Sequence, residues 1–246
     1  MNIPGVEVRR VERCASTNSV LLAQRGAAAP VLLVAAEQTA GRGRRGRRWH
    51  SAPGAGLTFS LARRIRRPAR ELAALSLVAG VAAARALRAL GVAQAALKWP
   101  NDLVAGGAKL GGILAETRAA AGATLAVFGI GINCRGAADL ERRLRRRVAC
   151  VEQFVPFFED NNIIEKITIA LMQALDAFEA GGLEALKGEW EAMHAHAGQR
   201  LKVRFADGRS VTGIAAGLAE DGALSLRTRA GLRAIRSGRV VSARAA

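Results

Sequence analysis

The stretch that most restricts how this chain can fold is residues 38–49, which places three glycines and five arginines between Gly41 and Arg48 and ends at Trp49. It offers almost no apolar side chain to a core, so the sequence predicts a surface loop. Glycine allows a ligand close to the backbone, and arginine carries a planar fork of donors that suits phosphate or carboxylate. The apolar run at residues 31–36 leads directly into the loop and predicts a buried strand. We therefore expect an anion-binding loop after a buried strand.

The net charge of +17 makes nucleic-acid binding an alternative function. However, arginine outnumbers lysine by 32 to 5, as coding bias also produces, and the arginines are scattered along the chain. There is no tyrosine and there are only seven phenylalanines, so few side chains could stack on the bases of single strands. Nucleic-acid binding is therefore the less favoured function.

The three cysteines show no metal-ligand spacing and cannot all pair, which predicts buried thiols in a reducing compartment. The N-terminal residues lack the pattern of a signal peptide, and Arg85 and Arg88 interrupt the best candidate for a membrane span. We expect a cytoplasmic protein without a membrane segment.

Hydrophobic periodicity predicts strands over residues 6–13, 57–61, 109–116 and 124–133, and a helix over residues 70–90 that ends at Gly91. The strands at 109–116 and 124–133 should be adjacent. They contain Gly111, Gly112, Gly129 and Gly131, which destabilise strands unless something must approach closely. These glycines predict the floor of a ligand pocket.

Ser16, Thr17 and Asn18 precede an apolar helical segment over residues 19–24. From this stretch alone, helix capping is the favoured interpretation. The alternative is that these short polar side chains bind the polar head of a ligand.

The C-terminal part changes character. Residues 141–147 form a charge run expected on an exposed helix or turn, and residues 163–179 and 183–194 predict two amphipathic helices. Five short strands then follow residue 199, with hairpin signals at Asp207-Gly208 and Asp221-Gly222. We expect a domain over residues 1–198 and a small SH3-like barrel over residues 199–246.

Several common site motifs are excluded or weak. Residues 41–46 fit G-x-G-x-x-G, but the residues after Gly46 cannot open a helix and no acidic residue follows at the spacing of a ribose contact. No Walker lysine ends the run. His194 and His196 have no further ligand at metal spacing and predict surface histidines at a domain junction.

Taken together and in order, the motifs at residues 16–18, 37–49, 98–102, 109–113 and 129–133 resemble those of the biotin–protein ligases. The resemblance covers nearly the whole chain, except residues 141–165. It implies an α+β fold, with a mixed β-sheet catalytic domain of the class II synthetase-like biotin/lipoate ligase type backed by helices, and a C-terminal SH3-like barrel. It implies that biotin and MgATP give biotinyl-5′-AMP, and that a lysine of a biotin carboxyl carrier protein then accepts the biotin.

The resemblance also implies roles for single residues. Lys109 matches the lysine that bonds the biotin carboxyl oxygen and the α-phosphate, and Arg42 and Arg44 assist it. The biotin-binding positions are Ser16, Thr17, Asn18, Gln38, Gly41, Arg42, Gly43, Arg44, Lys109, Gly111, Gly112 and Gly129. The ATP-binding positions are Arg44, Arg47, Trp49, Asn101, Lys109 and Asn133, with Asp102 as a candidate Mg²⁺ ligand. Arg244 is a further candidate for ATP contact, although the chain ending is one residue longer than is usual in the family.

Only fifteen residues precede Ser16, which is too few for a DNA-binding domain. We therefore expect a monofunctional ligase that does not bind DNA and is a monomer or a homodimer. Its acceptor would be the carrier protein of acetyl-CoA carboxylase or a related carboxylase. The alternative within the fold is a lipoate or octanoate ligase or transferase. We also expect residues 38–49 to be mobile without ligand and to close over biotinyl-adenylate.

Overall fold

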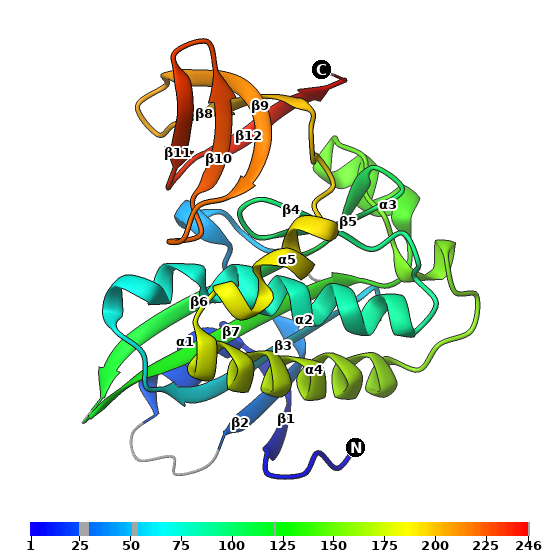
Figure 1. The fold of residues 1–246 in the computed structure, drawn as a ribbon. Helices are drawn as coiled ribbons and strands as arrows, with labels where there is room; N and C mark the ends of the chain where they lie inside the picture. The colour runs from blue at the N-terminus through cyan, green and yellow to red at the C-terminus, as the bar shows by residue number, and fades with distance from the viewer. Residues whose placement is uncertain (25–29, 51–53, 121, 246) are drawn as a thin grey trace.

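The computed structural model describes residues 1–24, 30–50, 54–120 and 122–245, and contains two sheets (Figure 1). The larger is seven-stranded, in the order β1-β2-β3-β7-β6-β5-β4. In it β1 and β2 are parallel, and the other neighbouring strands are antiparallel. Its strands are β1 (Glu7–Cys14), β2 (Val31–Gln38), β3 (Gly56–Ile65), β4 (Ala96–Lys98), β5 (Asp102–Ala105), β6 (Ala108–Ala120) and β7 (Ala123–Asn133). The predicted mixed sheet and its strands are confirmed.

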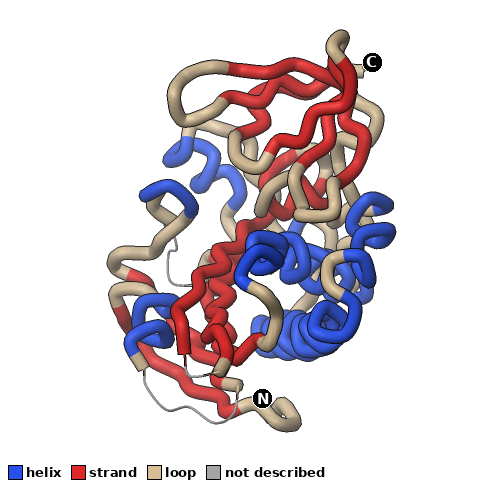
Figure 2. The backbone as a smooth tube through the Cα atoms, turned by 60° about the vertical axis from the view of Figure 1, so that its left-hand side comes forward, coloured by secondary structure: helices blue, strands red, loops and turns tan. Residues whose placement is uncertain are grey.

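Helices pack on both faces of the larger sheet, which explains why β2 is apolar on both sides. Leu32 and Val34 belong to the main core, whereas Val31 and Leu33 pack with Leu21 in a separate cluster under α1. Helices α2, α4 and α5 lie together on one face (Figures 1 and 2). The helices are α1 (Thr17–Ala23), α2 (Leu75–Ala89), α3 (Ala137–Leu144), α4 (Asp160–Gly181) and α5 (Glu184–Ala192). Three short 3₁₀ turns are η1 (Arg44–Gly46), η2 (Ala69–Ala74) and η3 (Val151–Gln153).

The helix predicted over residues 70–90 is confirmed, although its first part is the 3₁₀ turn η2 rather than α-helix. Its length and mean hydropathy of 1.5 would suffice to cross a membrane, despite Arg85 and Arg88. However, 72% of the most apolar 18-residue stretch of this segment is buried inside the fold, as in the core helix of a folded domain. Burial therefore accounts for its apolar sequence.

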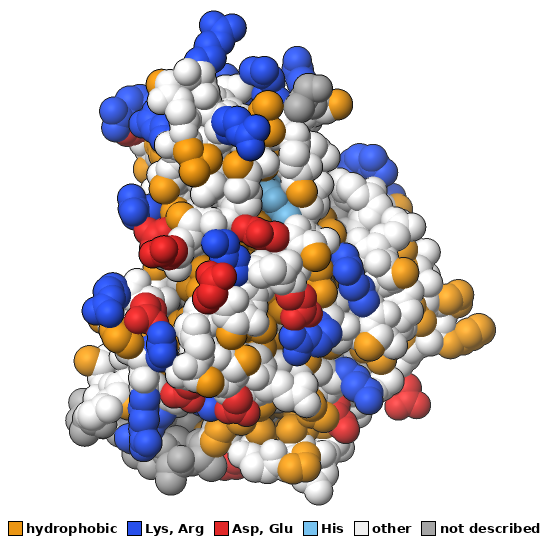
Figure 3. All heavy atoms as spheres, viewed as in Figure 1, with side chains coloured by type: hydrophobic (Ala, Val, Ile, Leu, Met, Phe, Trp, Pro, Cys, Tyr) orange, Lys and Arg blue, Asp and Glu red, His pale blue; other side chains and the backbone are white. Residues whose placement is uncertain are grey.

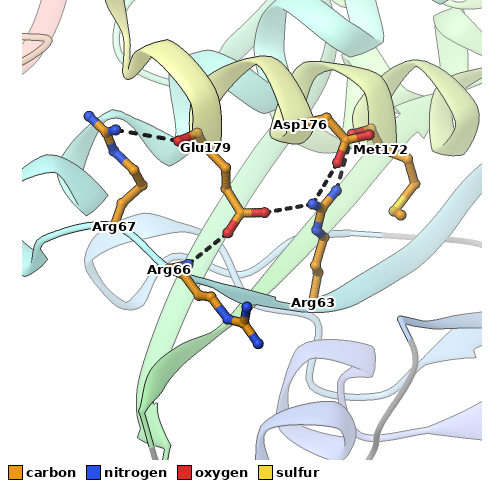
Figure 4. A network of polar contacts seen from close by, with 6 residues as sticks. All are labelled: Arg63, Arg66, Arg67, Met172, Asp176 and Glu179. Atoms are coloured by element: carbon orange, nitrogen blue, oxygen red, sulfur yellow. Dashed lines mark hydrogen bonds and ion pairs between the residues drawn. The ribbon is translucent and has the colours of Figure 1, made fainter.

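Helix α4 is tied to the end of β3 by a polar network (Figure 4). The Arg63 guanidinium donates to Asp176 and Glu179, each at 2.6 Å, and to the backbone carbonyl of Met172 at 3.2 Å. Glu179 also accepts from the backbone N–H of Arg66 at 2.8 Å. Because one partly buried arginine serves three acceptors, the network fixes the position of α4 along the sheet.

The smaller sheet is five-stranded and antiparallel, in the order β11-β10-β9-β8-β12. Its strands are β8 (Arg200–Arg204), β9 (Ser210–Leu218), β10 (Leu224–Thr228), β11 (Gly231–Ile235) and β12 (Arg239–Arg244), and all follow the predicted boundary. The turns at Gly208 and Gly222 have φ values of 85° and 80°, a region that glycine adopts without a steric penalty. The predicted SH3-like barrel and its two glycine turns are confirmed.

The barrel packs directly on the larger domain. The Trp99 indole N–H donates to the carbonyl of Gly222 at 3.2 Å, and Glu191 of α5 accepts from the backbone N–H of Leu218 at 2.8 Å. Residues 193–195 run beside β4, where Leu97 exchanges backbone hydrogen bonds with Met193 and Ala195, both at 2.8 Å. These contacts hold the barrel against α5 and against the end of β4.

Candidate active site

A cavity of about 720 Å³ lies between the larger sheet, the arginine loop and the barrel. The structure brings most of the predicted site residues to this one cavity, although they come from distant parts of the chain. Those that line it are Ser16, Thr17, Asn18, Gln38, Arg42, Gly43, Arg44, Arg47, Trp49, Asn101, Asp102, Lys109, Gly112 and Gly129.

Three predicted site residues, Gly41, Gly111 and Asn133, are not among the residues that line this cavity. A Cβ atom at Gly41 or Gly111 would come 2.7 or 2.6 Å from a backbone carbonyl oxygen. The Asn133 side-chain amide donates to the carbonyls of Lys109 at 3.1 Å and Ala149 at 3.3 Å. In this structure these residues shape and support the cavity wall, and their contact with ligand stays a prediction.

One end of the cavity is a hydrogen-bonded polar pocket. Gln38 Oε1 accepts from the backbone N–H of Thr17 at 2.8 Å and lies 3.0 Å from the Thr17 hydroxyl. Ser60 Oγ lies 2.6 Å from Thr17 Oγ1 and donates to Asn18 Oδ1 at 2.6 Å. The side chain of Ser16 makes no capping hydrogen bond, so the capping interpretation is wrong. Instead, Gln38 accepts the hydrogen bond from the Thr17 N–H at the start of α1. The side chains of Ser16, Thr17 and Asn18 therefore contribute to the pocket rather than to a helix cap.

Ser60 was missed by sequence reasoning. Its strand reads Leu57-Thr58-Phe59-Ser60-Leu61, in which the apolar side chains face the core and the two hydroxyls share the other face. Ser60 is fully buried, so a hydroxyl there requires hydrogen-bond partners. Two polar residues on one face of a buried strand were therefore a usable signal of the pocket.

The glycines of β6 and β7 form a floor on which side chains lie closely. Gly112 and Gly131 are register partners. A Cβ at Gly131 would come 2.3 Å from the Trp49 ring, and one at Gly129 would come 2.4 Å from Asn18 Oδ1. The expectation that something approaches these glycines closely is confirmed, and in this structure it is the protein's own Trp49 and Asn18.

The arginine loop lies at the surface, as predicted, but it is not without internal structure. Arg42 and Arg48 form an isolated antiparallel bridge, and the Gly43 N–H donates to the carbonyl of Arg47 at 2.7 Å. Arg45 adopts a φ of 58°, the left-handed region that a non-glycine residue rarely occupies. The loop is a closed turn whose guanidinium groups border the cavity, and its mobility stays a prediction.

The other wall of the cavity is cationic. Burial lowers the pKa of Arg44, assisted by the neighbouring charge of Arg45, and burial also lowers the pKa of Lys98. Among the described residues that line the cavity, Asp102 is the one carboxylate. The lining cations are Arg42, Arg44, Arg45, Arg47, Arg48, Lys98, Lys109, Arg146, Arg147 and Arg239. An excess of this size suits a ligand that carries several negative charges.

Lys98, Arg146, Arg147 and Arg239 were absent from the predicted site. Lys98 stands within one of the quoted motifs, but the arginines come from a segment without a family motif and from the barrel. Arg239, rather than the candidate Arg244, lies among the lining residues. Arg239 borders the cavity because the barrel packs on the larger domain.

Lys109 lies at the centre of the cationic wall. Its ammonium group forms an ion pair with Asp102 and lies 5.9 Å from the centroid of the Trp49 ring. Its backbone carbonyl accepts from the Ala149 N–H at 2.9 Å as well as from Asn133. The lysine is held from behind while its charge faces the cavity.

No group of three or more His, Cys, Asp or Glu side chains that could hold a metal exists among the described residues. Asp102 alone fits Mg²⁺ only as one oxygen ligand beside those of a phosphate chain, which is a common way for proteins to bind this ion. The donor set therefore fits a metal that arrives with a nucleotide.

The prediction that His194 and His196 are surface residues is wrong for His194, which is 7% exposed and stacks against Trp190. Burial, with His196 as a second cause, lowers the pKa of His194 to about 4. His196 lines the cavity, and burial lowers its pKa too. His194 is buried where the chain leaves α5 and pairs with Leu97 of β4, a contact that local sequence does not show.

The chain is similar to known proteins over nearly its whole length. The profile of the biotin/lipoate A/B protein ligase family matches residues 11–133, and that of the biotin protein ligase C-terminal domain matches residues 196–241. A biotin–[acetyl-CoA-carboxylase] ligase of Paracoccus denitrificans is 32% identical over 93% of this chain and 97% of its own length. The bifunctional ligase/repressor BirA of Salmonella typhimurium is 34% identical over 78% of this chain, which spans 60% of that relative's length.

Among solved structures, the biotin protein ligase from Aquifex aeolicus in complex with biotin and ATP superposes with a TM-score of 0.81. It is 26% identical, over 98% of this chain and 99% of that chain. Sequence and structure agree over both the sheet domain and the barrel, and the chain belongs to the biotin/lipoate A/B protein ligase family.

Proposed function

We propose that this protein activates biotin with ATP as biotinyl-5′-AMP and transfers biotin to a lysine of a biotin carboxyl carrier protein domain. The observation that carries the proposal is that one cavity joins a fixed polar pocket to a cationic wall around Lys109. The names of the relatives support biotin over lipoate within the family. The cavity volume of about 720 Å³ is in the range of small-molecule sites.

In the first step a biotin carboxylate oxygen attacks the α-phosphorus of ATP, and the bond to the β-phosphate oxygen breaks to release pyrophosphate. Two anionic groups must meet, and fixed cations stabilise the charge that develops better than mobile water does. Lys109 and Arg44 border the cavity at the cationic wall and are suited to this role. Lysine is a compact charge that can follow an oxygen between partners.

In the second step the neutral amine of the acceptor lysine attacks the carbonyl carbon of the anhydride. The amide forms, AMP leaves with the electron pair, and the amine loses a proton. The short polar side chains of Thr17, Asn18 and Gln38 are suited to hold the N–H and C=O groups of the biotin head during both steps. Mg²⁺ would be held by Asp102 together with phosphate oxygens and would neutralise part of their charge.

The test is adenylate synthesis by the purified protein with ATP labelled at the α-phosphate and either biotin or lipoate. Labelled acyl-adenylate should form with biotin. Adenylate with lipoate alone would favour the alternative ligase, and no adenylate with either would contradict the proposal. Tight duplex binding without an ATP requirement would support the nucleic-acid alternative.

We further propose that the basic surface recruits an acidic carrier domain. Lys and Arg side chains gather over the barrel at the top of the view in Figure 3. Attraction between exposed charges weakens with ionic strength, so the KM for the acceptor protein should rise with salt while the KM for biotin stays constant. Steady-state assays from 20 to 300 mM salt would measure this. An acceptor KM that does not change with salt would contradict recruitment by charge.

A further inference from the structure

Glu116 of β6 connects two of the predicted site residues through one carboxylate. Its Oε2 accepts from the Asn18 side-chain amide at 2.8 Å, and its Oε1 forms an ion pair with the guanidinium of Arg42. Asn18 belongs to the polar pocket, whereas Arg42 belongs to the arginine loop. Glu116 thus joins Arg42 of the loop directly to Asn18 of the pocket.

On the pocket side, Glu116 helps to fix which way the Asn18 amide points. Asn18 Nδ2 donates to Glu116 and to the carbonyl of Leu114 at 3.1 Å, while Oδ1 accepts from Ser60. A flipped amide would place its oxygen against two acceptors and its N–H groups against a donor. Asn18 is 2% exposed, so water cannot replace these partners. The orientation of the amide over Gly129 therefore depends on Glu116.

On the loop side, the same carboxylate holds the guanidinium of Arg42. The other terminal nitrogen of the Arg42 guanidinium donates to the Ser19 hydroxyl at 3.1 Å. The Glu116 side chain is 21% exposed and that of Arg42 is 50% exposed. Residues 40–48 also border a second, smaller hollow together with Leu114 and Glu116 of β6. The ion pair anchors the start of the loop to the sheet.

We propose that Glu116 is a positioning residue that couples the closure of the arginine loop to recognition of the ligand head at Asn18. It takes no part in bond making. A ligand that engages Asn18 stabilises the Glu116 conformation that also holds Arg42, and a closed loop stabilises the Asn18 amide in return. The identification of the ligand as biotin rests on the proposed function, whereas the coupling of loop and pocket does not.

Two substitutions separate the two contacts. Glu116→Gln keeps an acceptor oxygen for Asn18 but turns an N–H₂ group toward Arg42 and removes the ion pair. Glu116→Ala removes both contacts. Glu71→Gln is the matched control, because the Glu71 side chain is 26% exposed, pairs with Arg67 and does not line the cavity.

The first measurement needs no ligand and no activity. Trypsin cleavage after the arginines of residues 42–48 is followed by mass spectrometry in each protein. Both Glu116 variants should be cleaved there roughly two- to fivefold faster than the parent, as expected when a partly exposed ion pair is lost. Glu71→Gln should be cleaved at the parental rate. Parental cleavage of both Glu116 variants would overturn the anchoring of the loop.

The second measurement uses biotin and ATP. Glu116→Ala should raise the KM for biotin about tenfold, because the Asn18 donor loses its buried acceptor, and Glu116→Gln should raise it much less. The KM for ATP should stay within about twofold in both. A parental KM for biotin in Glu116→Ala would overturn the role at Asn18. If the parent itself makes no adenylate, the proposed function fails, while the trypsin comparison still decides whether Glu116 anchors the loop.

Discussion

At the scale of single residues, the site depends on side chains that lie directly against glycines of the sheet. Trp49 lies on Gly131, and Asn18 lies on Gly129, each closer than a methyl group at the glycine would allow. Lys109 is held by its backbone from behind and by Asp102 in front. Such placement before ligand arrives lowers the cost of organising the site during the reaction.

Lys109→Ala should lose adenylate synthesis while the fold survives, because the residue is partly exposed and its role is to supply charge. Removing one fixed donor of this kind lowers kcat by roughly 100- to 1,000-fold. Lys202→Ala, on an exposed position of β8, is the control and should keep parental activity. Adenylate synthesis at the parental rate in Lys109→Ala would show that the assigned role is wrong.

Gly131→Ala should displace the Trp49 ring, because the new methyl carbon would lie 2.3 Å from it. If Trp49 stacks on adenine, the KM for ATP should rise about tenfold, the usual scale of one base–aromatic stack. Gly188→Ala is the control: apart from its chain neighbours and its own helix backbone, a Cβ there would meet no described atom within 4 Å, and alanine in a helix adds roughly 0.5–1 kcal/mol of stability. A parental ATP KM and unchanged tryptophan fluorescence in Gly131→Ala would contradict the prediction.

At the scale of elements, the segment after α5 matters because it joins the two sheets. Residues 193–195 extend the edge of the larger sheet beside β4, and His194 and His196 lie edge to face with ring centroids 6.0 Å apart. Within the part of the chain that the structure describes, His194 Nε2 and His196 Nδ1 are buried polar atoms without a hydrogen-bond partner. The junction therefore accommodates neutral imidazoles better than charged ones.

The pH dependence of the free energy of unfolding should show this preference for a neutral His194. The pKa of His194 falls from 6.5 to about 4 on folding, so the unfolded chain binds the proton more readily between these values. Its contribution to stability is complete above about pH 6.5 and is lost as the pH falls toward 4. Denaturant unfolding at pH 7 and pH 4.5 should show an acid loss that is smaller in His194→Phe by on the order of 2 kcal/mol.

His50→Gln is the comparison variant: burial also lowers the pKa of His50, but this residue is less buried than His194, so its removal should reduce the acid loss by less than His194→Phe does. The same pH dependence in the parent and in His194→Phe would place the titrating group elsewhere.

At the scale of the whole molecule, the cavity is shared between the sheet domain and the barrel. Gly238, Arg239, Val240 and Ala243 contribute to its lining from the barrel side. Arg239 also adds a positive charge near Lys98. The barrel is therefore part of the wall of the candidate ATP site.

Arg239→Ala should raise the KM for ATP about three- to tenfold at low ionic strength, and the difference from the parent should shrink with added salt. The KM for biotin should not change, because the polar pocket lies on the sheet domain. Arg233→Ala, an exposed arginine of β11 outside the cavity lining, is the control. Equal ATP KM values for both variants and the parent would exclude a role for the barrel charge.

The sequence by itself determined the elements, the two glycine strands, the arginine loop and the resemblance that identified the motifs. These are encoded over short distances: alternation and helical spacing report which faces are buried, and glycine with aspartate marks tight turns. Single motif residues also indicated the site, because a glycine inside a strand, and a lysine or arginine beside it, each have few physical reasons to occur at such positions.

Only the tertiary structure decided which side chains meet. Gln38 accepts from the start of the helix that residues 16–18 were expected to cap, Glu116 reaches Asn18 across 98 positions of sequence, and Arg239 enters the cavity from the barrel. These contacts follow from the order of strands in the sheet and from the docking of the barrel. Neither leaves a periodic signal in the chain, because each contact pairs residues that are far apart in sequence and near in space.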